Sequence, residues 1–490
     1  MGKKKLAKDR LRRPEKMARE ELVLHPDRLF DPAPGVRTMA RELYESVREL
    51  PIVSPHGHVN PKLFAGEKVS FGDPTELFII PDHYLFRMLY SQGIHPANLG
   101  VPRIDGGKVE TDHRKIWQAV ADHFYLFRGT PTGLWLDYEF SEVFGLKYRL
   151  SSETAMEMYD EIKEKLQRPE YYPRALFEKF GIEVLCTTDS ATDTLKDHEA
   201  IRRSDWKGDI RPSFRPDSVI NGLGTEEWRR NIEVLSDLAG IDISDFKSYL
   251  EALKRRREYF KKMGATATDS AALTPYTEQL SSAEVETLFQ RGLKGKATPE
   301  EAARFTSHLL IEMAGMSVED GLVMQLHPGS FRDHNELIYG TFGRDKGGDI
   351  PIQVDFTRGL KALLNKYGNN PKLTLVIFTL DEDTYSRELA PLAGHYPALR
   401  LGPPWWFHDS VNGIRRYLDR ITETAGIYNL AGFNDDTRAF PSIPARHDVW
   451  RRCCANWLAG LVSRHIIAIS AAREIIIELA YRLAKKTYRL

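Results

Sequence analysis

The sequence predicts an α/β protein built as a distorted (β/α)₈ barrel of the TIM type, with large helical insertions after strands 1 and 3. Three observations support this fold class. Short apolar runs recur along the 490 residues, and long amphipathic segments separate most of them. This alternation is typical of a parallel sheet covered by helices. Each run also ends in a polar cluster, and the carboxyl ends of barrel strands carry the catalytic residues.

Eight runs are predicted to form the strands. In chain order they are Leu50–Val53, Ile182–Cys186, Asp209–Ile210, Gly264–Thr268, Leu322–Leu326, Leu373–Phe378, Leu399–Leu401 and Tyr428–Phe433. Two intervals between runs are too long for simple crossovers, so residues 60–175 and 220–263 are predicted to be largely helical insertions. Residues 46–490 are therefore expected to form the barrel, and residues 1–45 a helical extension before it.

Two helices can be placed from local signals. Thr298-Pro299-Glu300-Glu301 combines an N-cap, a proline at the first helical position and a glutamate at N3, which predicts a helix to about Gly315. Phe246, Leu250, Leu253 and Phe260 share one helical face, and the basic run 254–257 is expected to lie on the solvated side of that helix.

Composition narrows the function. Lys+Arg and Asp+Glu number 69 each, so the formal charge is zero and nothing indicates binding to nucleic acid or to a membrane surface. No apolar run reaches the length of a membrane span. Residues 1–20 are basic without an apolar segment, so a secretory signal is not expected, and a frayed basic helix is favoured over an arm that binds nucleic acid. Cys186, Cys453 and Cys454 are too few for a disulfide framework, so a reducing, cytoplasmic setting is expected.

The first polar cluster predicts half of a metal site. His56 and His58 follow the first strand and, in an extended backbone, point to the same side. Asp435 and Asp436 follow the last strand, which neighbours the first in a closed barrel. Two histidines and one carboxylate with open positions are typical of a catalytic metal. Taken alone, two aspartates here are more often caps of the following loop; together with the histidine pair, a metal site is favoured, with Asp435 and Asp436 as the two candidate ligands.

Other clusters predict the surroundings of the metal. Asp82 is expected to cap a helix whose first turn carries His83 and Tyr84, where the helix dipole favours negative charge and would lower the pKa of the phenol. Arginines also stand at strand ends, and the guanidinium group suits bidentate capture of a carboxylate, which predicts an anionic substrate. These arginines are Arg215, Arg332 and Arg438.

Together these segments resemble the uronate isomerase (glucuronate isomerase) family of the amidohydrolase superfamily. The segments that carry the resemblance run in the same order from about residue 22 to the C-terminal end; they are Ser-Pro-His-Gly-His, Pro-Asp-His-Tyr-Leu-Phe-Arg-Met-Leu-Tyr-Ser-Gln-Gly, Cys-Thr-Thr-Asp, Pro-Ser-Phe-Arg-Pro-Asp, Gln-Leu-His-Pro-Gly, Trp405-Trp406-Phe and Asp436-Thr-Arg438. The resemblance implies a distorted (β/α)₈ barrel with one divalent metal ion, usually zinc. It also implies interconversion of D-glucuronate with D-fructuronate, and of D-galacturonate with D-tagaturonate.

The resemblance also implies residue roles. His56, His58 and Asp436 would hold the metal. Tyr84, His83, Asp436 and Arg438 would be catalytic, and the substrate would contact Arg215, His327, Arg332, Trp405 and Trp406. The sequence departs from the family at Asp269-Ser270-Ala271, where Asp-His-Gly is common, and at Trp135-Leu-Asp-Tyr138, where histidines are common. Both departures bear on substrate preference.

A mechanism follows as a hypothesis. A Tyr84 phenolate would take the C2 proton, and Asp436 with bound water would open the sugar ring and move protons between oxygens. Hydride shift is the rival path. The alternative function is a metal-dependent hydrolase of the same superfamily, acting on an acidic small molecule. No lysine suited to bridge two metals stands at a strand end, which disfavours that alternative. A homo-oligomer is expected only by analogy.

Overall fold

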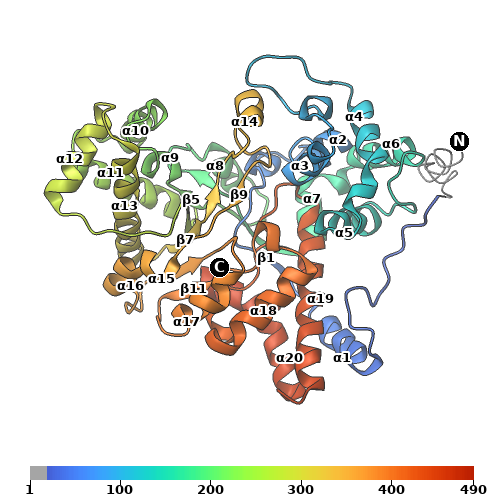
Figure 1. The fold of residues 1–490 in the computed structure, drawn as a ribbon. Coiled ribbons are helices and arrows are strands. Elements are labelled where there is room, and N and C mark those ends of the chain that lie inside the picture. The colour runs from blue at the N-terminus through green and yellow to red at the C-terminus, as the bar shows by residue number, and fades with distance from the viewer. Residues whose placement is uncertain (1–18) are drawn as a thin grey trace, which may run out of the picture.

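The computed structural model describes residues 19–490, so most of the basic helix expected in residues 1–20 lies outside the described part of the chain. Short parallel strands occupy the centre, and helices surround them (Figure 1). The predicted α/β class with parallel strands is therefore confirmed.

The strands form two parallel sheets and one small hairpin. The first sheet has the order β1-β2-β4 and the second β11-β10-β7-β6-β5-β3. Strands β8 (Ser330–Phe331) and β9 (Ile350–Pro351) pair antiparallel. The parallel strands are β1 (Ile52–Ser54), β2 (Ile182–Cys186), β3 (Asp189–Ser190), β4 (Ile210–Arg211), β5 (Phe214–Arg215), β6 (Ala267–Ala272), β7 (Val323–Pro328), β10 (Leu375–Ile377) and β11 (Leu399–Leu401).

Backbone hydrogen bonds connect the two sheets at one side. The chain passes from the first sheet to the second where β3 follows β2, and again where β5 follows β4. At this passage the Thr187 amide donates to the Arg211 carbonyl at 2.8 Å. At the other edge of the second sheet, the Ala431 amide donates to the Leu401 carbonyl at 2.8 Å. The chain just beyond Ala431 then pairs with the turn after β1, which brings the first and last strand ends together.

Seven of the eight predicted runs overlap a parallel strand. The eighth run does not form the predicted six-residue strand. Within Tyr428–Phe433 only Leu430 forms a bridge, with Leu401, and Ile427–Asn429 is a 3₁₀ turn. Residues 430–433 are apolar and buried, whereas Tyr428 is exposed, and burial alone does not require a ladder of hydrogen bonds. The short strands β3 and β5 were not predicted, because their residues lie within polar clusters.

Helices fill the long intervals between strands. The interval between β1 and β2 holds α2 (Pro74–Phe78), α3 (His83–Ser91), α4 (His113–Asp122), α5 (Pro131–Tyr138), α6 (Ala155–Leu166) and α7 (Pro173–Lys179). The interval between β5 and β6 holds α9 (Asp217–Ile220), α10 (Glu226–Ala239) and α11 (Phe246–Lys262). These two groups lie on opposite sides of the strands (Figure 1).

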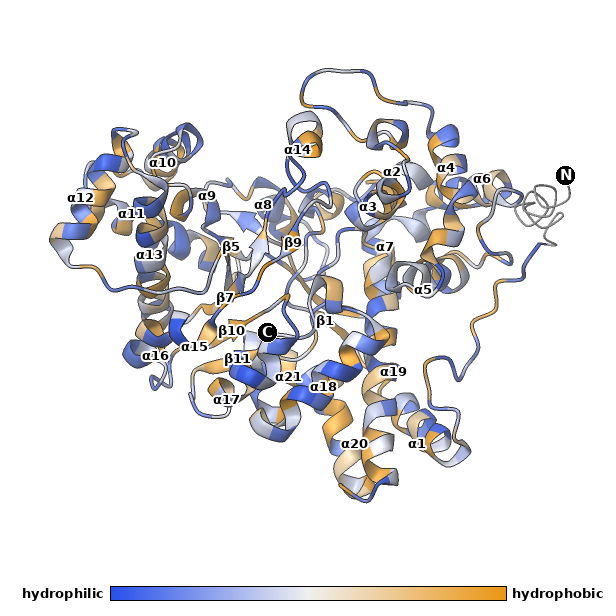
Figure 2. Cartoon of the chain, in the orientation of Figure 1, coloured by the Kyte–Doolittle hydropathy of each residue, from blue (hydrophilic) through white to orange (hydrophobic). Residues whose placement is uncertain are grey.

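The remaining helices cover the sheets and the two chain ends. They are α1 (Pro34–Glu45), α8 (Lys196–Arg203), α12 (Ser282–Leu293), α13 (Pro299–Asp320), α14 (Glu336–Phe342), α15 (Phe356–Gly359), α16 (Lys361–Tyr367), α17 (Ala390–Ala393), α18 (Val411–Ala425), α19 (Ser442–Ser463), α20 (Ile469–Ile477) and α21 (Leu483–Tyr488). Figure 2 shows hydrophobic residues along the central strands and mixed colouring along the helices around them. None of the helices in residues 19–490 combines the length and apolar composition needed to cross a bilayer.

The two helices expected from local signals are present, with one correction. Thr298 caps α13 through the predicted capping box, and the helix extends to Asp320 rather than to about Gly315. In α11, however, the basic run is not fully solvated, because Arg256 and Arg257 are 4% and 1% exposed. Arg257 forms an ion pair with Asp320 at 2.6 Å. Its partner comes from another helix, which the pattern within α11 does not indicate.

Candidate functional site

The turn after β1, which carries His56 and His58, forms hydrogen bonds with residues 436–437 on one side and with Thr188 on the other. The His58 amide donates to the Thr437 carbonyl at 2.8 Å, and the Asp436 amide donates to the His56 carbonyl at 3.3 Å. From the end of β2, the Thr188 hydroxyl donates to the Gly57 carbonyl at 2.9 Å. Asp436 has a φ of +48°, a conformation that aspartate tolerates better than most residues. The first and last strand ends therefore fix one another.

This pairing brings the three predicted metal ligands together. Nε2 of His56 lies 3.4 Å and Nε2 of His58 lies 3.1 Å from the same Oδ1 of Asp436. The ligand atoms of a tetrahedral ion with bonds of about 2.0 Å are about 3.3 Å apart, so these three residues fit a divalent cation. Burial disfavours the charged carboxylate, but hydrogen bonds from His56 and His58 hold the pKa of Asp436 well below its usual range.

The neighbouring aspartate takes a different role. Asp435 is fully buried, and its Oδ2 lies 3.2 Å from Nε2 of His447 in α19. The two adjacent carboxylates thus point to different partners, and only Asp436 joins the histidine pair. Trp405, one of the two tryptophans expected to contact the substrate, donates from Nε1 to Oδ2 of Asp436 at 3.1 Å.

His327 lies beside the metal-ligand group and is joined to a residue that the sequence analysis did not assign to the site. Its Nδ1 is 2.8 Å from Oδ1 of Asp269, and its ring stacks on His56 at 4.9 Å. Burial lowers the pKa of His327 to about 4, although Asp269 opposes this shift, so the imidazole is neutral at ordinary pH. The position of Asp269 at the end of a predicted strand was the available signal.

The three predicted arginines differ in how closely aspartates of the protein pair with their guanidinium groups. Arg215 pairs with Asp217 at 2.7 Å and with Asp269 at 3.0 Å. Arg332 pairs with Asp349 at 2.6 Å and lies over Trp406. The other is Arg438, whose one ion-pair contact among residues 19–490 is Asp345 at 3.9 Å. Arg438 therefore has the most donors available for a ligand.

His83 and Tyr84 begin α3, as predicted, and Asp82 caps the helix by accepting a hydrogen bond from the Tyr84 amide at 2.8 Å. Burial and the charge of Arg438 lower the pKa of His83 to about 3. The predicted lowering of the Tyr84 pKa is wrong. Burial raises the pKa of this phenol, and the charge of Asp436 acts in the same direction, so the helix dipole does not decide it.

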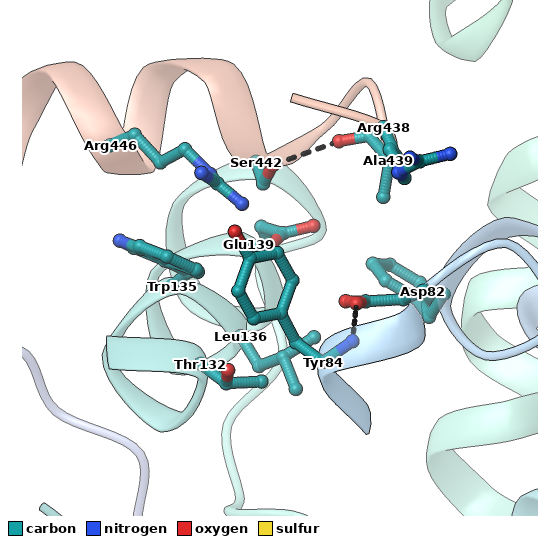
Figure 3. A pocket seen from close by; sticks show the side chains of 11 residues that line it. Asp82, Tyr84, Thr132, Trp135, Leu136, Glu139, Arg438, Ala439, Ser442 and Arg446 are labelled. Carbon is teal, nitrogen blue, oxygen red and sulfur yellow. Dashed lines mark hydrogen bonds between the residues drawn. The ribbon is translucent and has the colours of Figure 1, made fainter. Parts of the chain in front are cut away.

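A small pocket adjoins Tyr84 (Figure 3). Its lining includes Trp135, Glu139, Arg438 and Arg446. Arg446 was missed from the sequence because it lies inside the long helix α19, away from any strand end. Its guanidinium lies 3.7 Å from the centre of the Trp135 ring and 5.7 Å from that of Tyr84. The predicted departure at Trp135 therefore borders the candidate site.

The comparisons with known proteins agree with this geometry. The family model described as glucuronate isomerase matches residues 36–488. The chain belongs to the glucuronate isomerase family. It is 54% identical to a uronate isomerase of Nostoc punctiforme over 97% of this chain and 100% of the relative. A solved glucuronate isomerase of Caulobacter crescentus superposes with a TM-score of 0.94 at 49% identity, covering 96% of this chain and 98% of the other. A uronate isomerase of Thermotoga maritima gives a TM-score of 0.87 at 30% identity, covering 95% and 99%.

Proposed function

We propose that this protein is a uronate isomerase that interconverts D-glucuronate with D-fructuronate and D-galacturonate with D-tagaturonate. The observation that best supports this is the meeting of His56, His58 and Asp436 beside a guanidinium group with free donors, in a chain of this family. The family match favours isomerisation over the alternative, hydrolysis by a metal-dependent member of the superfamily.

The proposed cofactor is one divalent cation, zinc, held by His56, His58 and Asp436. Two imidazole nitrogens and one carboxylate oxygen are a donor set that zinc takes in catalytic sites. When bound, the ion supplies positive charge that stabilises oxyanions of the substrate. Trp405 orients Asp436 through its second oxygen, as partners of ligands commonly do.

Arg438 is proposed as the principal contact of the substrate carboxylate. Arg215 and Arg332 already pair with aspartates, so we assign them to shape the pocket and to strengthen its positive charge. The neutral imidazole of His327 has a buried Nε2 without a partner among residues 19–490, which suits a hydrogen bond to a sugar hydroxyl. Trp405 and Trp406 are proposed as the apolar wall.

Isomerisation moves the carbonyl from C1 to C2, so a proton leaves C2 and another is delivered to C1. Tyr84 is proposed as the base at C2, and it must lose its own proton before it accepts one. Arg446 is the cation beside it that favours the phenolate, against burial and the charge of Asp436. Asp436 and His83 are proposed to move protons between the sugar oxygens, and Arg438 to stabilise the enediolate charge.

Incubation in deuterium oxide tests both the reaction and its path. The metal-loaded protein is given D-glucuronate and, separately, D-galacturonate, and the products are followed by NMR. We expect the corresponding ketoses, with deuterium at C1. Ketose without deuterium would favour hydride shift, and absence of ketose from both acids would contradict the proposed function.

Several features of the whole chain are proposed with this function. Residues 46–490 are proposed to form a closed, distorted (β/α)₈ barrel, with residues 1–45 as an extension and residues 60–175 and 220–263 as insertions. The protein is proposed to be cytoplasmic and to form a homo-oligomer. Three buried free cysteines, Cys186, Cys453 and Cys454, support a reducing compartment.

A further inference from the structure

Asp345 lies among the basic groups of the candidate site. It belongs to the segment between β8 and β9, and its Oδ1 is 3.9 Å from the guanidinium of Arg438. Burial opposes ionisation of this carboxyl, but the charge of Arg438, and next that of Arg332, lowers the pKa of Asp345. His83 and Arg215 act in the same direction. Four residues of the candidate site thus favour the ionised form of one carboxylate of the protein.

Asp345 also differs from the other acidic groups near these arginines. Asp269 and Asp349 are buried and make ion pairs of 3.0 Å and 2.6 Å with Arg215 and Arg332. The side chain of Asp345 is 54% exposed, and its ion pair is longer by about 1 Å. Asp345 therefore partly neutralises the charge of Arg438 but forms only a long, solvent-exposed ion pair with its guanidinium.

The backbone that carries Asp345 is well anchored. Asp349 accepts a hydrogen bond from the Asp333 amide at 2.8 Å and holds Arg332, which closes the base of the segment. Gly347 packs against the start of α3 so closely that a Cβ there would lie 3.0 Å from the His83 carbonyl. The position of Asp345 over the site is therefore part of the fold.

We propose that Asp345 is the internal counter-anion of Arg438, which competes with the carboxylate of the substrate for this guanidinium and gives up its place when an acid sugar binds. The inference rests on the proposed function. Because the side chain is half exposed, rotation into water releases Arg438 without a change of backbone. An acid sugar replaces the lost ion pair with its own carboxylate, whereas a neutral sugar has no such group and leaves Asp345 paired, so Asp345 weakens the binding of acid sugars in particular.

A matched pair of ligands tests this. L-Gulonate is glucuronate with its aldehyde reduced, so it cannot isomerise, and D-glucitol carries an alcohol in place of the remaining carboxylate. Binding of each to the metal-loaded protein is measured by titration calorimetry. The variants are Asp345→Asn, which keeps a residue tolerant of the φ of +59°, and Asp345→Gly as a second uncharged variant. Glu336→Gln, on the exposed face of α14, is the control that removes one charge from the same segment.

We expect both Asp345 variants to bind L-gulonate about twofold to fivefold more tightly than the wild type, the range for loss of a half-exposed competing ion pair. Glu336→Gln should change the affinity by much less, and D-glucitol, which has no carboxylate to compete for Arg438, should bind the wild type and both Asp345 variants alike. Weaker binding of L-gulonate to the Asp345 variants would overturn the proposal, because it would mean that Asp345 holds the ligand. Unchanged binding of L-gulonate, the same gain for D-glucitol, or the same gain in Glu336→Gln would overturn it as well. Ketose formation by the wild type is assayed separately, so failure of the proposed function is distinguishable from failure of this inference.

Discussion

Tyr84 combines a reactive position with an unfavourable charge environment. Its hydroxyl-bearing ring lies near Arg446, whereas Asp436, Asp409 and Asp82 all oppose its ionisation. Burial contributes most to the cost of forming the phenolate, and Arg446 is the group that lowers this cost. If Tyr84 transfers the C2 proton, its hydroxyl is needed for chemistry and not for folding.

Tyr84→Phe should lower kcat by about 10²- to 10⁴-fold, the usual contribution of one acid–base group. The ring is kept, so the melting temperature and the bound metal should match the wild type. Steady-state kinetics, thermal unfolding and metal analysis check this together. Full turnover in the variant would remove Tyr84 from the mechanism.

His198 predicts a pH dependence of stability. Burial lowers its pKa to about 4, whereas an unfolded histidine titrates near 6.5. Between these values the unfolded chain binds the extra proton, so the stability due to His198 is lost as the pH falls from about 6.5 to 4. Asp189, whose pKa burial raises to about 7, contributes the opposite slope.

His198→Gln removes the first slope. From pH 7 to pH 5 the wild type should lose about 2 kcal/mol more of unfolding free energy than the variant, because 1.5 units lie within the His198 window. Urea unfolding at the two values measures this. The variant should be the less stable protein at pH 7, since it loses the hydrogen bond with Thr187. Parallel losses in both proteins would contradict the prediction.

At the scale of elements, the turn after β1 depends on β2. The hydroxyl of Thr188 bonds the carbonyl of Gly57, which stands between the two histidines of the candidate metal site. A hydroxyl at this point limits rotation of the peptide that carries both imidazoles. It acts through the turn and not on the ligand atoms, so its loss should loosen the site without abolishing it.

Thr188→Val keeps the shape of the side chain and removes this bond. The metal should leave the variant about 10-fold faster when a chelator is added, in the lower part of the range for residues that orient ligands. Thr188→Ser should restore the wild-type rate. Thr192→Val is the matched control, because the Thr192 hydroxyl bonds Ser190 and not the turn. Equal release rates in Thr188→Val and the wild type would count against this role.

Sequence patterns predicted elements best where burial and pairing coincide. β2 and β11 match their predicted ranges because both are short and largely apolar and both pair with neighbouring strands. β2 lies between β1 and β4, and β11 pairs with β10 along its whole length. In the run Tyr428–Phe433, residues 430–433 are buried, but only Leu430 forms a bridge. Buried Arg257 shows the same limit, because its ion-pair partner Asp320 comes from another helix. The hydrophobic pattern within one element therefore indicates which residues are buried. It does not indicate their hydrogen-bond or ion-pair partners, because these partners belong to other elements.

The same limit applies to the site. The meeting of His56, His58 and Asp436 was predictable because, in the barrel expected from the sequence, the first and last strands would be neighbours. Arg446 and Asp345 were not predictable, because a mid-helix position and an irregular segment carry no such rule. The pKa of Tyr84 was predicted in the wrong direction for a related reason. A helix dipole is a local property, whereas burial and nearby charges are set by the whole fold.

For the whole molecule, the metal should couple the ends of the chain to overall stability. A ligand that binds only the folded state stabilises it by about 2.7 kcal/mol when present at 100 times its dissociation constant. A strong chelator should therefore lower the melting temperature of the wild type. Asp436→Asn should melt at the same temperature with and without the chelator. A full response in that variant would show that the stabilising ion binds elsewhere.

The contact between His56, His58 and Asp436 joins residues that the ribosome makes at very different times. About 380 residues separate the two halves of this cluster, and a ribosome adding about 5–20 residues per second needs about 20–80 s to make that length. Throughout this interval the nascent chain carries two imidazoles without their carboxylate. The histidine pair therefore gains its proposed carboxylate partner only after the chain has been made as far as Asp436, although the strand that precedes the histidines can pair with β2 long before.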